Sequence, residues 1–238
     1  MAAKLSTITA GTLKISAMSN DAPPLMSTVD GHRVGFEADL GRALADELGL
    51  TLEWVSVEEW GQLRVELDTG RCDAILCCQA ITPDREKEVA FTRPYASFDE
   101  GIVVRVDSAI TSAEDLAGRK VGAVAGTTNI ALARSFSGAT AVEFGSGDDA
   151  LGAMCDAVVS GEVDAMIDDE LLLPAVTASG ELRVAFVCPT KNPCALALRK
   201  ESGDLVAALD EALTRMFDDG RMRTLWQAHF TEKAFPFA

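Results

Sequence analysis

Apolar positions recur along this chain at two spacings, one typical of helices and one typical of buried strands. Phe36, Leu40, Leu44 and Leu48 share one face at helical spacing, and Gly49 follows them as a stop. Short apolar runs that predict strands stand between such segments. The expected order in the first half is strand, helix, strand, helix, strand, over residues 13–17, 36–48, 51–57, 60–67 and 72–78.

The second half of the chain repeats this order. The predicted strands are 120–125, 140–144 and 163–167, and the predicted helices between them are 127–136 and 148–159. Strands that alternate with helices indicate a mainly parallel sheet with helices on its faces. The fold class is therefore α/β, with two similar lobes.

A short internal repeat supports two similar halves. The segment 69–76 reads Thr-Gly-Arg-Cys-Asp-Ala-Ile-Leu, and 160–167 reads Ser-Gly-Glu-Val-Asp-Ala-Met-Ile. Each copy follows a predicted helix, places a glycine where that helix ends, and runs into a predicted strand. Asp73 and Asp164 stand at the strand starts, so we expect structural roles for them. Strand ends that point into a cleft between two lobes are common ligand sites.

Two extended stretches predict where the chain crosses between the lobes. These hinges are expected near residues 101–105 and 195–199. The first lobe is then discontinuous, with residues 1–102 and 198–238, and the second lobe is 103–197. The tail is predicted to be helical, with an interruption at Gly220.

Composition narrows the class of protein. The chain has 238 residues, of which 48% are hydrophobic, so it can form packed cores. Its formal net charge of −16 opposes binding to nucleic acid or to an anionic membrane. No run of about 18 apolar residues is present, and residues 1–10 lack the features of a signal peptide. The chain is interpreted as a cytosolic protein or as an exported protein whose targeting segment has been removed.

The six cysteines do not form a metal motif. There is no CxxC pair and there are only two histidines, so no metal site is predicted. Cys188 and Cys194 flank a turn-rich segment, which leaves two interpretations open: a disulfide that closes this loop, or two free thiols. Cys72, Cys77 and Cys155 are interpreted as small buried apolar residues.

Two segments of the chain suit a carboxylate ligand. Thr127 and Thr128 open a predicted helix after a strand, which exposes backbone N–H groups at a positive helix end; ordinary N-capping is the alternative. Arg85 follows the strand that ends at Cys78, in a turn started by proline, where its guanidinium suits a carboxylate. A solvated Arg85 paired with Asp84 or Glu88 is the alternative.

The corresponding strand of the second half ends in Asp168 and Asp169, which suit an ammonium group. Adjacent residues at a strand end point in different directions, so one of the two is expected to face a ligand. One lobe thus offers a cation and the other an anion, a pattern that favours a zwitterionic ligand. His32 and His229 suggest no catalytic pairing with a nucleophile.

These residues resemble the polar amino-acid solute-binding proteins of ABC importers, over roughly residues 13–230. The motifs that carry the resemblance are Gly35-Phe36-Glu37-Ala38-Asp39-Leu40, Trp60, Asp73-Ala74, Ile81-Thr82-Pro83-Asp84-Arg85, Phe91-Thr92-Arg93-Pro94-Tyr95, Gly126-Thr127-Thr128 and Asp164-Ala165. The resemblance implies a periplasmic-binding-protein-like fold of type II, with two lobes that close over one amino acid. It also implies no cofactor, ABC membrane subunits as partners and a monomer that is periplasmic or lipid-anchored at a cell surface.

Position by position, the resemblance implies a set of ligand contacts. Arg85 corresponds to the carboxylate-binding arginine, helped by the backbone at Ala80 and by Thr128, while Asp169 corresponds to the acid that takes the α-ammonium group. Trp60 corresponds to an aromatic wall over the ligand side chain, and Cys78 and Thr127 are also expected among the ligand contacts.

Three positions depart from the family pattern. Ala80 replaces a serine or threonine, Asp21 stands where many relatives have an aromatic residue, and Asp168 adds a second acid beside Asp169. The extra acids indicate a cationic or hydrogen-bond-donating ligand side chain, unless Asp21 and Asp168 face water.

Two other functions remain as alternatives. Cyclohexadienyl dehydratases share this scaffold, but their catalytic glutamate corresponds to Leu172 here, so prephenate or arogenate turnover is not expected. The ligand-sensing domain of a receptor is the second alternative.

Overall fold

The computed structural model describes residues 5–147 and 149–237. The chain divides into two compact units: unit 1 comprises Met1–Ser97 and Asn192–Ala238, and unit 2 comprises Phe98–Lys191. The chain passes from one unit to the other within two long strands, β7 (Ala96–Arg105) and β11 (Leu182–Cys194).

The sheet of unit 1 has the strand order β4-β1-β5-β12-β6. Its strands are β4 (Thr51–Val57), β1 (Thr12–Met18), β5 (Ala74–Ile75), β12 (Ala197–Leu198) and β6 (Ala90–Phe91). β1 runs parallel to β4 and β5, while β12 runs antiparallel to β5 and β6. A separate hairpin consists of β2 (Ser27–Val29) and β3 (His32–Val34).

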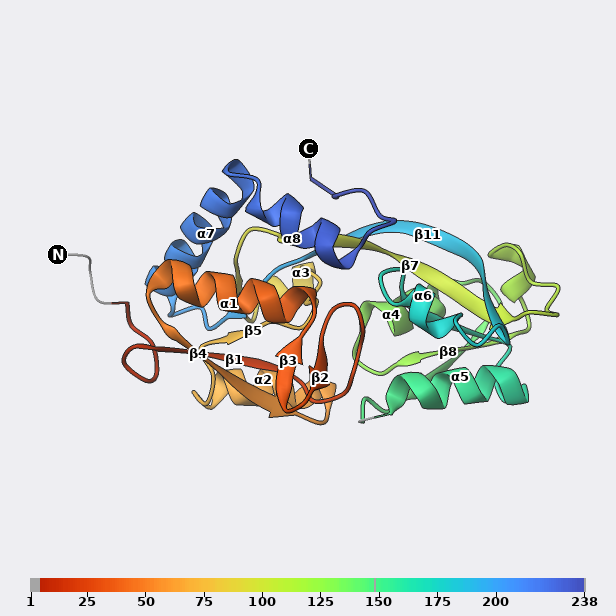
Figure 1. The fold of residues 1–238 in the computed structure, drawn as a ribbon. Helices are drawn as coiled ribbons and strands as arrows, with labels where there is room; N and C mark the ends of the chain where they lie inside the picture. The colour runs from red at the N-terminus through yellow and green to blue at the C-terminus, as the bar shows by residue number, and fades with distance from the viewer. Residues whose placement is uncertain (1–4, 148, 238) are drawn as a thin grey trace. The chain divides into compact units, whose positions relative to one another are not determined.

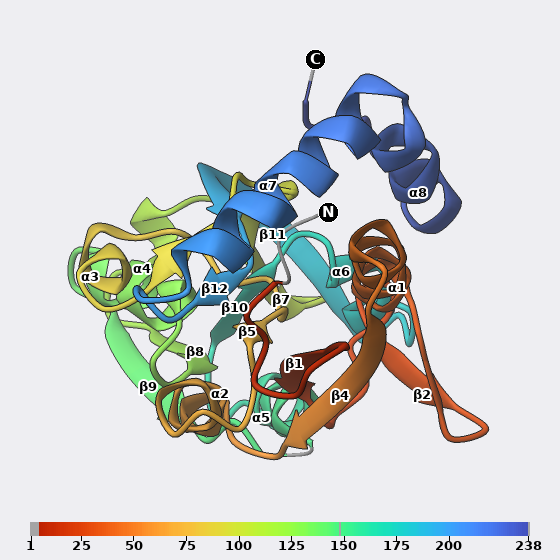
Figure 2. The ribbon, with the colours of Figure 1, turned by 90° about the vertical axis from the view of Figure 1, so that its left-hand side faces the viewer.

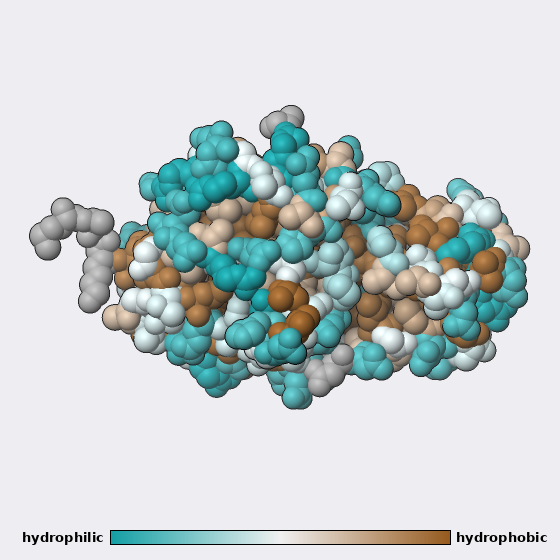
Figure 3. Space-filling model, in the orientation of Figure 1, coloured by the Kyte–Doolittle hydropathy of each residue, from teal (hydrophilic) through white to brown (hydrophobic). Residues whose placement is uncertain are grey.

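Helices cover both faces of this sheet (Figures 1 and 2). They are α1 (Phe36–Leu48), α2 (Trp60–Asp68), α3 (Pro83–Glu86), α7 (Gly203–Asp218) and α8 (Arg221–His229). α1 packs against α7 and α8. α2 lies on the opposite face, where Leu63 and Leu67 are buried in a cluster with Ile75. On the face of the molecule drawn in Figure 3, hydrophilic side chains gather over α7.

Unit 2 has a second sheet of related topology, with the order β11-β7-β10-β8-β9. Its remaining elements are β8 (Lys120–Val124), α4 (Thr128–Ser135), β9 (Thr140–Phe144), α5 (Ala150–Ser160), β10 (Ala165–Asp169), α6 (Leu173–Val176) and a 3-10 turn, Glu114–Leu116. β10 pairs parallel with β8 and antiparallel with β7, as β5 does with β1 and β12 in unit 1. The α/β fold with two sheet-based halves is confirmed.

Two buried clusters show which residues of β10 face each layer of helices. Ala165 and Ile167 pack with Ile130 of α4. Met166, one residue on, packs with Met154 of α5 on the other face. This alternation continues to the end of the strand, so Asp168 and Asp169 lie on opposite faces of the sheet.

The strand and helix predictions hold with small shifts in their bounds. The last strand of each half differs most: the predicted 72–78 is β5, Ala74–Ile75, and the predicted 163–167 is β10, Ala165–Asp169. The backbone turns at Cys78, whose φ is 41°. This value lies in the left-handed region, so no extended strand continues to that residue. Asp148, the first residue of one predicted helix, lies outside the described residues.

The two copies of the repeat adopt the same local structure. Asp73 N donates to Lys14 O at 2.8 Å, and Asp73 Oδ2 accepts from Lys14 N at 2.9 Å. Asp164 and Lys120 repeat both bonds, each at 2.9 Å. Each carboxylate therefore accepts a backbone N–H from the neighbouring parallel strand, from Lys14 of β1 or Lys120 of β8, and the expected structural role of both aspartates is confirmed.

The structure contradicts the interpretation of Cys188 and Cys194 as a disulfide that closes a loop. Both residues lie on one strand, β11, six residues apart. Six residues of extended chain span roughly 20 Å, whereas a disulfide needs Cα atoms within about 7 Å of each other. A bond between these two cysteines is therefore excluded. Among the described residues, no helix is long and apolar enough to cross a membrane.

Candidate functional site

In unit 1, Arg85 is positioned by the short helix α3. The Thr82 side chain caps this helix by accepting a hydrogen bond from Arg85 N at 3.2 Å. Pro83 occupies the first helical position, where its fixed φ suits the turn. The local sequence Thr-Pro-Asp-Arg thus fixes the backbone from which the guanidinium extends.

The Arg85 guanidinium lies between a carbonyl and an aromatic ring. Its Nη1 donates to Ala80 O at 3.0 Å, and its Cζ lies 5.9 Å from the centroid of the Trp60 ring. The two acids proposed as alternative partners are engaged elsewhere: Asp84 pairs with Lys87, and Glu88 pairs with Arg64, each at 2.7 Å. The structure therefore brings Arg85, Ala80 and Trp60 together.

The backbone of Ala80 faces the same side as Arg85. Ala80 forms an isolated antiparallel bridge with Cys194, and the two bonds of this bridge are made by the flanking residues, Ile81 N to Pro193 O and Ala195 N to Gln79 O. In such a pair the central residues direct their N–H and C=O groups away from the partner strand. The C=O of Ala80 reaches Arg85, and its N–H points to the same side.

A buried acid supports the turn that precedes Ala80. Glu37 is 2% exposed; its carboxylate accepts from Cys78 N at 2.6 Å and from the Tyr95 hydroxyl. Burial raises the pKa of Glu37, and the two hydrogen bonds oppose that effect. Glu37 therefore holds Cys78 in its left-handed conformation. Cys78 itself is buried, and a ligand contact by it stays a prediction.

Asp21 serves a turn. It is exposed, and its Oδ1 accepts a hydrogen bond from Thr28 N at 2.8 Å at the start of the β2–β3 hairpin. Nearby Arg33 has a lowered pKa because burial disfavours its charge, an effect that Cys77 and Asp21 oppose. A ligand contact by Asp21 stays a prediction.

In unit 2, Thr127 and Thr128 stand at the start of α4. Thr127 Oγ1 accepts from Ile130 N at 3.4 Å and donates to Val124 O at 2.6 Å, so this hydroxyl caps the helix. Thr128 Oγ1 lies 3.3 Å from the side-chain amide of Asn129. Gly126, with φ of 77°, lets the chain turn from β8 into the helix.

Asp169 is joined by a second acid that the sequence did not single out. In the register of β7 and β10, Glu100 lies directly opposite Asp169, and Glu100 is 2% exposed. The Asn129 amide, oriented by its hydrogen-bonding partners, donates to Glu100 Oε1 at 2.9 Å and to Asp169 Oδ1 at 3.3 Å. These three residues form an acidic group at the end of the sheet face that α4 covers.

Asp168 lies on the other face of the same strand. It pairs with Gly101 in the register, and its Oδ1 accepts from Asp169 N at 2.8 Å. Burial raises the pKa of Asp168 to about 6, and the hydrogen bond from Asp169 opposes the rise. The expectation that the two aspartates point in different directions is confirmed.

The sequence analysis did not identify Glu100 or Asn129 as residues of the candidate site. Glu100 immediately precedes the apolar stretch that was interpreted as a hinge, and a charged residue next to a buried strand was the available signal. Asn129 follows Gly126-Thr127-Thr128, where its neighbours drew attention as helix-capping residues. Neither spacing nor composition indicates that β7 pairs with β10.

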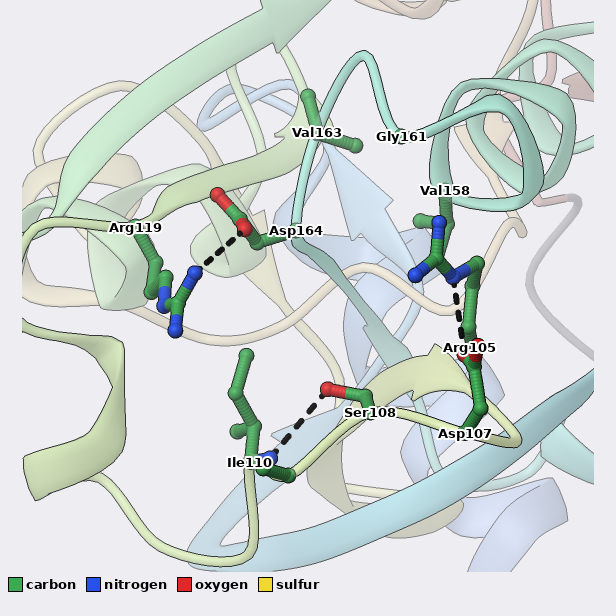
Figure 4. Close-up of a pocket in the computed structure, with 10 residues that line it drawn as sticks. Arg105, Asp107, Ser108, Ile110, Arg119, Val158, Gly161, Val163 and Asp164 are labelled. Carbon is green, nitrogen blue, oxygen red and sulfur yellow. Dashed lines mark hydrogen bonds and ion pairs between the residues drawn. The ribbon is translucent and has the colours of Figure 1, made fainter.

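A separate pocket of about 300 Å³ lies at the other end of the unit 2 sheet (Figure 4). Arg119 pairs with Asp164 at 3.2 Å, and Arg105 pairs with Asp107 at 3.0 Å, at the rim. Asp164 precedes the first residue of β10, whereas Asp169 is its last. Each guanidinium already faces a carboxylate, so these charges balance within the pocket.

The described part of the chain contains no candidate metal site, and Leu172 stands where a catalytic glutamate was considered. Among the described residues, no group of three or more His, Cys, Asp or Glu side chains could hold a metal ion. Leu172 is 9% exposed, and its N–H bonds Asp169 O at 2.9 Å in the turn after β10. An aliphatic side chain at this position can neither donate nor accept a proton.

The chain resembles known proteins over most of its length. The model of the bacterial extracellular solute-binding proteins, family 3, matches residues 15–232. The arginine-binding extracellular protein ArtP of Bacillus subtilis (strain 168) is 29% identical, over 91% of this chain and 86% of that one. The L-cystine-binding protein TcyJ of Escherichia coli (strain K12) is 28% identical, over 92% and 83%.

A solved structure extends the comparison to a protein related to an enzyme. The ancestral amino acid-binding protein AncCDT-1, a precursor of cyclohexadienyl dehydratase, is 31% identical. The match has a TM-score of 0.81 and covers 92% of this chain and 95% of that one.

Proposed function

Because this chain belongs to the bacterial extracellular solute-binding proteins of family 3, we propose that it is the substrate-binding component of an ABC importer. Its ligand is a polar or cationic L-amino acid, and it is a binding protein rather than an enzyme. The named relatives bind arginine and cystine, which are both amino acids with polar side chains.

The observation that carries this proposal is the opposite charge of the two half-sites. Unit 1 presents Arg85 beside the backbone of Ala80, and unit 2 presents Asp169 with Glu100. A guanidinium binds a carboxylate with two parallel hydrogen bonds, and carboxylates bind an ammonium group. We propose that the two half-sites take the two charged groups of one amino acid, and that Trp60 and Thr128 add contacts to it.

Ligand binding is proposed to work by closure of the two units over the amino acid. A ligand stabilises a closed form only through contacts that the open form lacks, and the two charge pairs supply such contacts. ABC membrane subunits would then distinguish the closed form from the open one. We further propose that the protein acts as a monomer outside the cytoplasmic membrane, either free in a periplasm or lipid-anchored.

Isothermal titration calorimetry tests the proposal. The titrants are L-arginine, L-lysine, L-glutamine and L-cystine, each compared with the amine that lacks its α-carboxylate. At least one amino acid is expected to bind, and loss of its carboxylate is expected to abolish binding. Equal affinity for the amino acid and its decarboxylated amine would contradict the role of Arg85.

A matched pair of arginine variants sharpens this test. Arg85→Ala removes a charge-assisted bidentate contact and should cost about 2 to 4 kcal/mol of binding free energy. Arg71→Ala is the control, because Arg71 pairs with Glu66 on the surface of the same unit and is 57% exposed. It should leave the affinity unchanged.

A further inference from the structure

Two cysteines of unit 1 meet in its interior although 116 residues separate them in the chain. The Sγ atoms of Cys78 and Cys194 are 2.9 Å apart. Cys194 is fully buried and Cys78 is 9% exposed. A disulfide bond is about 2.05 Å long, so the two sulfurs need to approach each other by less than about 1 Å.

The backbone holds both cysteines at this separation. Cys194 forms the antiparallel bridge with Ala80, and its C=O accepts from Tyr95 N at 2.9 Å. Cys78 donates its N–H to the Glu37 carboxylate at 2.6 Å. Glu37 of α1 fixes the backbone of Cys78, while Ala80 and Tyr95 fix the backbone of Cys194. The short distance between the two sulfurs therefore follows from how these segments pack in unit 1.

We propose that Cys78 and Cys194 form a disulfide bond in the exported protein, and that this bond fixes the carboxylate half-site. The bond would join the turn before Ala80 to the end of β11. Arg85 donates to the carbonyl of Ala80, so a fixed Ala80 also fixes the position of the guanidinium. Preorganisation of this kind raises affinity because less freedom is lost when the ligand binds.

The chemistry of the bond is thiol–disulfide exchange with the disulfide of an extracytoplasmic oxidoreductase. One thiolate attacks that disulfide and forms a mixed disulfide, and the second thiolate of the pair then displaces the enzyme. The two cysteines lose two electrons and two protons, and the oxidoreductase is reduced to a dithiol. Exchange occurs during folding, before the two sulfurs are buried. This step rests on the extracytoplasmic location in the proposed function, because such compartments maintain disulfides.

Cys72, in the same unit, is fully buried, and burial raises the pKa of its thiol to about 12 in the folded protein. The thiolate is the reactive form, so Cys72 is a poor partner for a later exchange once the protein has folded.

Peptide mapping of the exported wild-type protein tests the bond. The protein is denatured without reductant, its free thiols are alkylated, and the digest is analysed by mass spectrometry. We expect the peptides of Cys78 and Cys194 to be linked and the other four cysteines to be alkylated. Alkylation of Cys78 and Cys194, or a link from either one to Cys77 or Cys188, would overturn the proposal.

The clamping role has its own readouts. Reduction of the wild-type protein, or the variants Cys78→Ser and Cys194→Ser, should lower the melting temperature and raise the dissociation constant for the amino acid ligand several-fold. Cys155→Ser, on α5 of unit 2, is the matched control and should change neither value. Equal melting temperatures of the oxidised and reduced wild-type protein would overturn the clamping role. A mapped disulfide in a protein that binds no amino acid would leave the bond standing and contradict the proposed function alone.

Discussion

Glu100 and Asp169 stand directly opposite each other on the antiparallel strands β7 and β10. Like charges at opposite positions of a sheet repel each other, and Glu100 is almost completely buried. The Asn129 amide donates to both carboxylates but carries no charge of its own. A cationic group of a ligand would lower the repulsion, so we expect this pair to favour ligands that carry a positive charge.

Glu100→Gln is therefore expected to weaken binding of a cationic amino acid. The variant keeps an oxygen acceptor and removes one negative charge, so the dissociation constant for L-arginine or L-lysine should rise about 10- to 100-fold. L-glutamine carries the same α-ammonium group and should lose affinity by a similar factor. Calorimetry with the three ligands measures the losses.

Glu143→Gln is the matched control for this variant. Glu143 lies on β9 of the same unit, where it pairs with Arg134 on the surface and is 49% exposed. Its replacement should leave all three affinities unchanged. Unchanged affinity of the Glu100 variant for all three ligands would contradict a role of Glu100 in binding the ammonium group.

Asp168→Asn is expected to change the dependence of stability on pH. Burial raises the pKa of Asp168 from 3.8 to about 6 in the folded protein. The folded state therefore holds the proton more tightly, and stability is lost as the pH rises from below about 4 to above about 6. The difference between 3.8 and about 6 corresponds to about 3 kcal/mol.

The variant cannot ionise at this position, so it should gain stability over the wild type at pH 8 and lose that advantage at pH 4. Urea denaturation at the two pH values measures the change. Asparagine keeps the oxygen that accepts from Asp169 N. Identical pH profiles of the two proteins would show that Asp168 ionises as an exposed aspartate does.

The sequence predicted most of the fold because local signals agreed with the final packing. The helix 36–48 combined a regular apolar face with a glycine stop, and the structure ends α1 at Leu48 with Gly49 in the left-handed region, at φ of 64°. The repeat predicted a shared topology, and Asp73 and Asp164 make the same pair of bonds in both units.

The site was predicted only where its residues follow strand ends in the chain. Arg85 follows a strand and Asp169 is the last residue of one, and their ligand contacts stay predictions. Glu100 enters the site through the pairing of β7 with β10, a contact between distant segments that periodicity does not report. The sulfur pair was missed for the same reason: Cys194 was assigned to a loop with Cys188, its neighbour in sequence, whereas its neighbour in space is Cys78.

Tyr95→Phe is expected to destabilise unit 1. The Tyr95 hydroxyl is fully buried and donates to the Glu37 carboxylate. Its removal takes one donor from a buried acid and should cost about 1 to 3 kcal/mol. Glu37→Ala should cost more, because it also leaves Cys78 N without its acceptor. Chemical denaturation ranks the two variants, and an equal cost would mean that the bond to Cys78 contributes nothing.

The two aspartates of the repeat allow a final comparison. Asp73 is fully buried, and its carboxylate accepts from both Ile8 N and Lys14 N. Asp164 is 34% exposed, and its carboxylate accepts from Lys120 N and pairs with Arg119. Water can replace part of what Asp164 provides, whereas the donors around Asp73 would remain buried.

Asp73→Ala should therefore lower the free energy of unfolding by about 2 to 4 kcal/mol, and Asp164→Ala by about 1 kcal/mol. Neither variant should change ligand affinity, because both aspartates stand at strand starts and the proposed ligand contacts stand at strand ends. Denaturation and calorimetry on the same samples separate the two effects. A loss of ligand affinity under conditions where the variant is fully folded would show that a residue at a strand start contributes to the site.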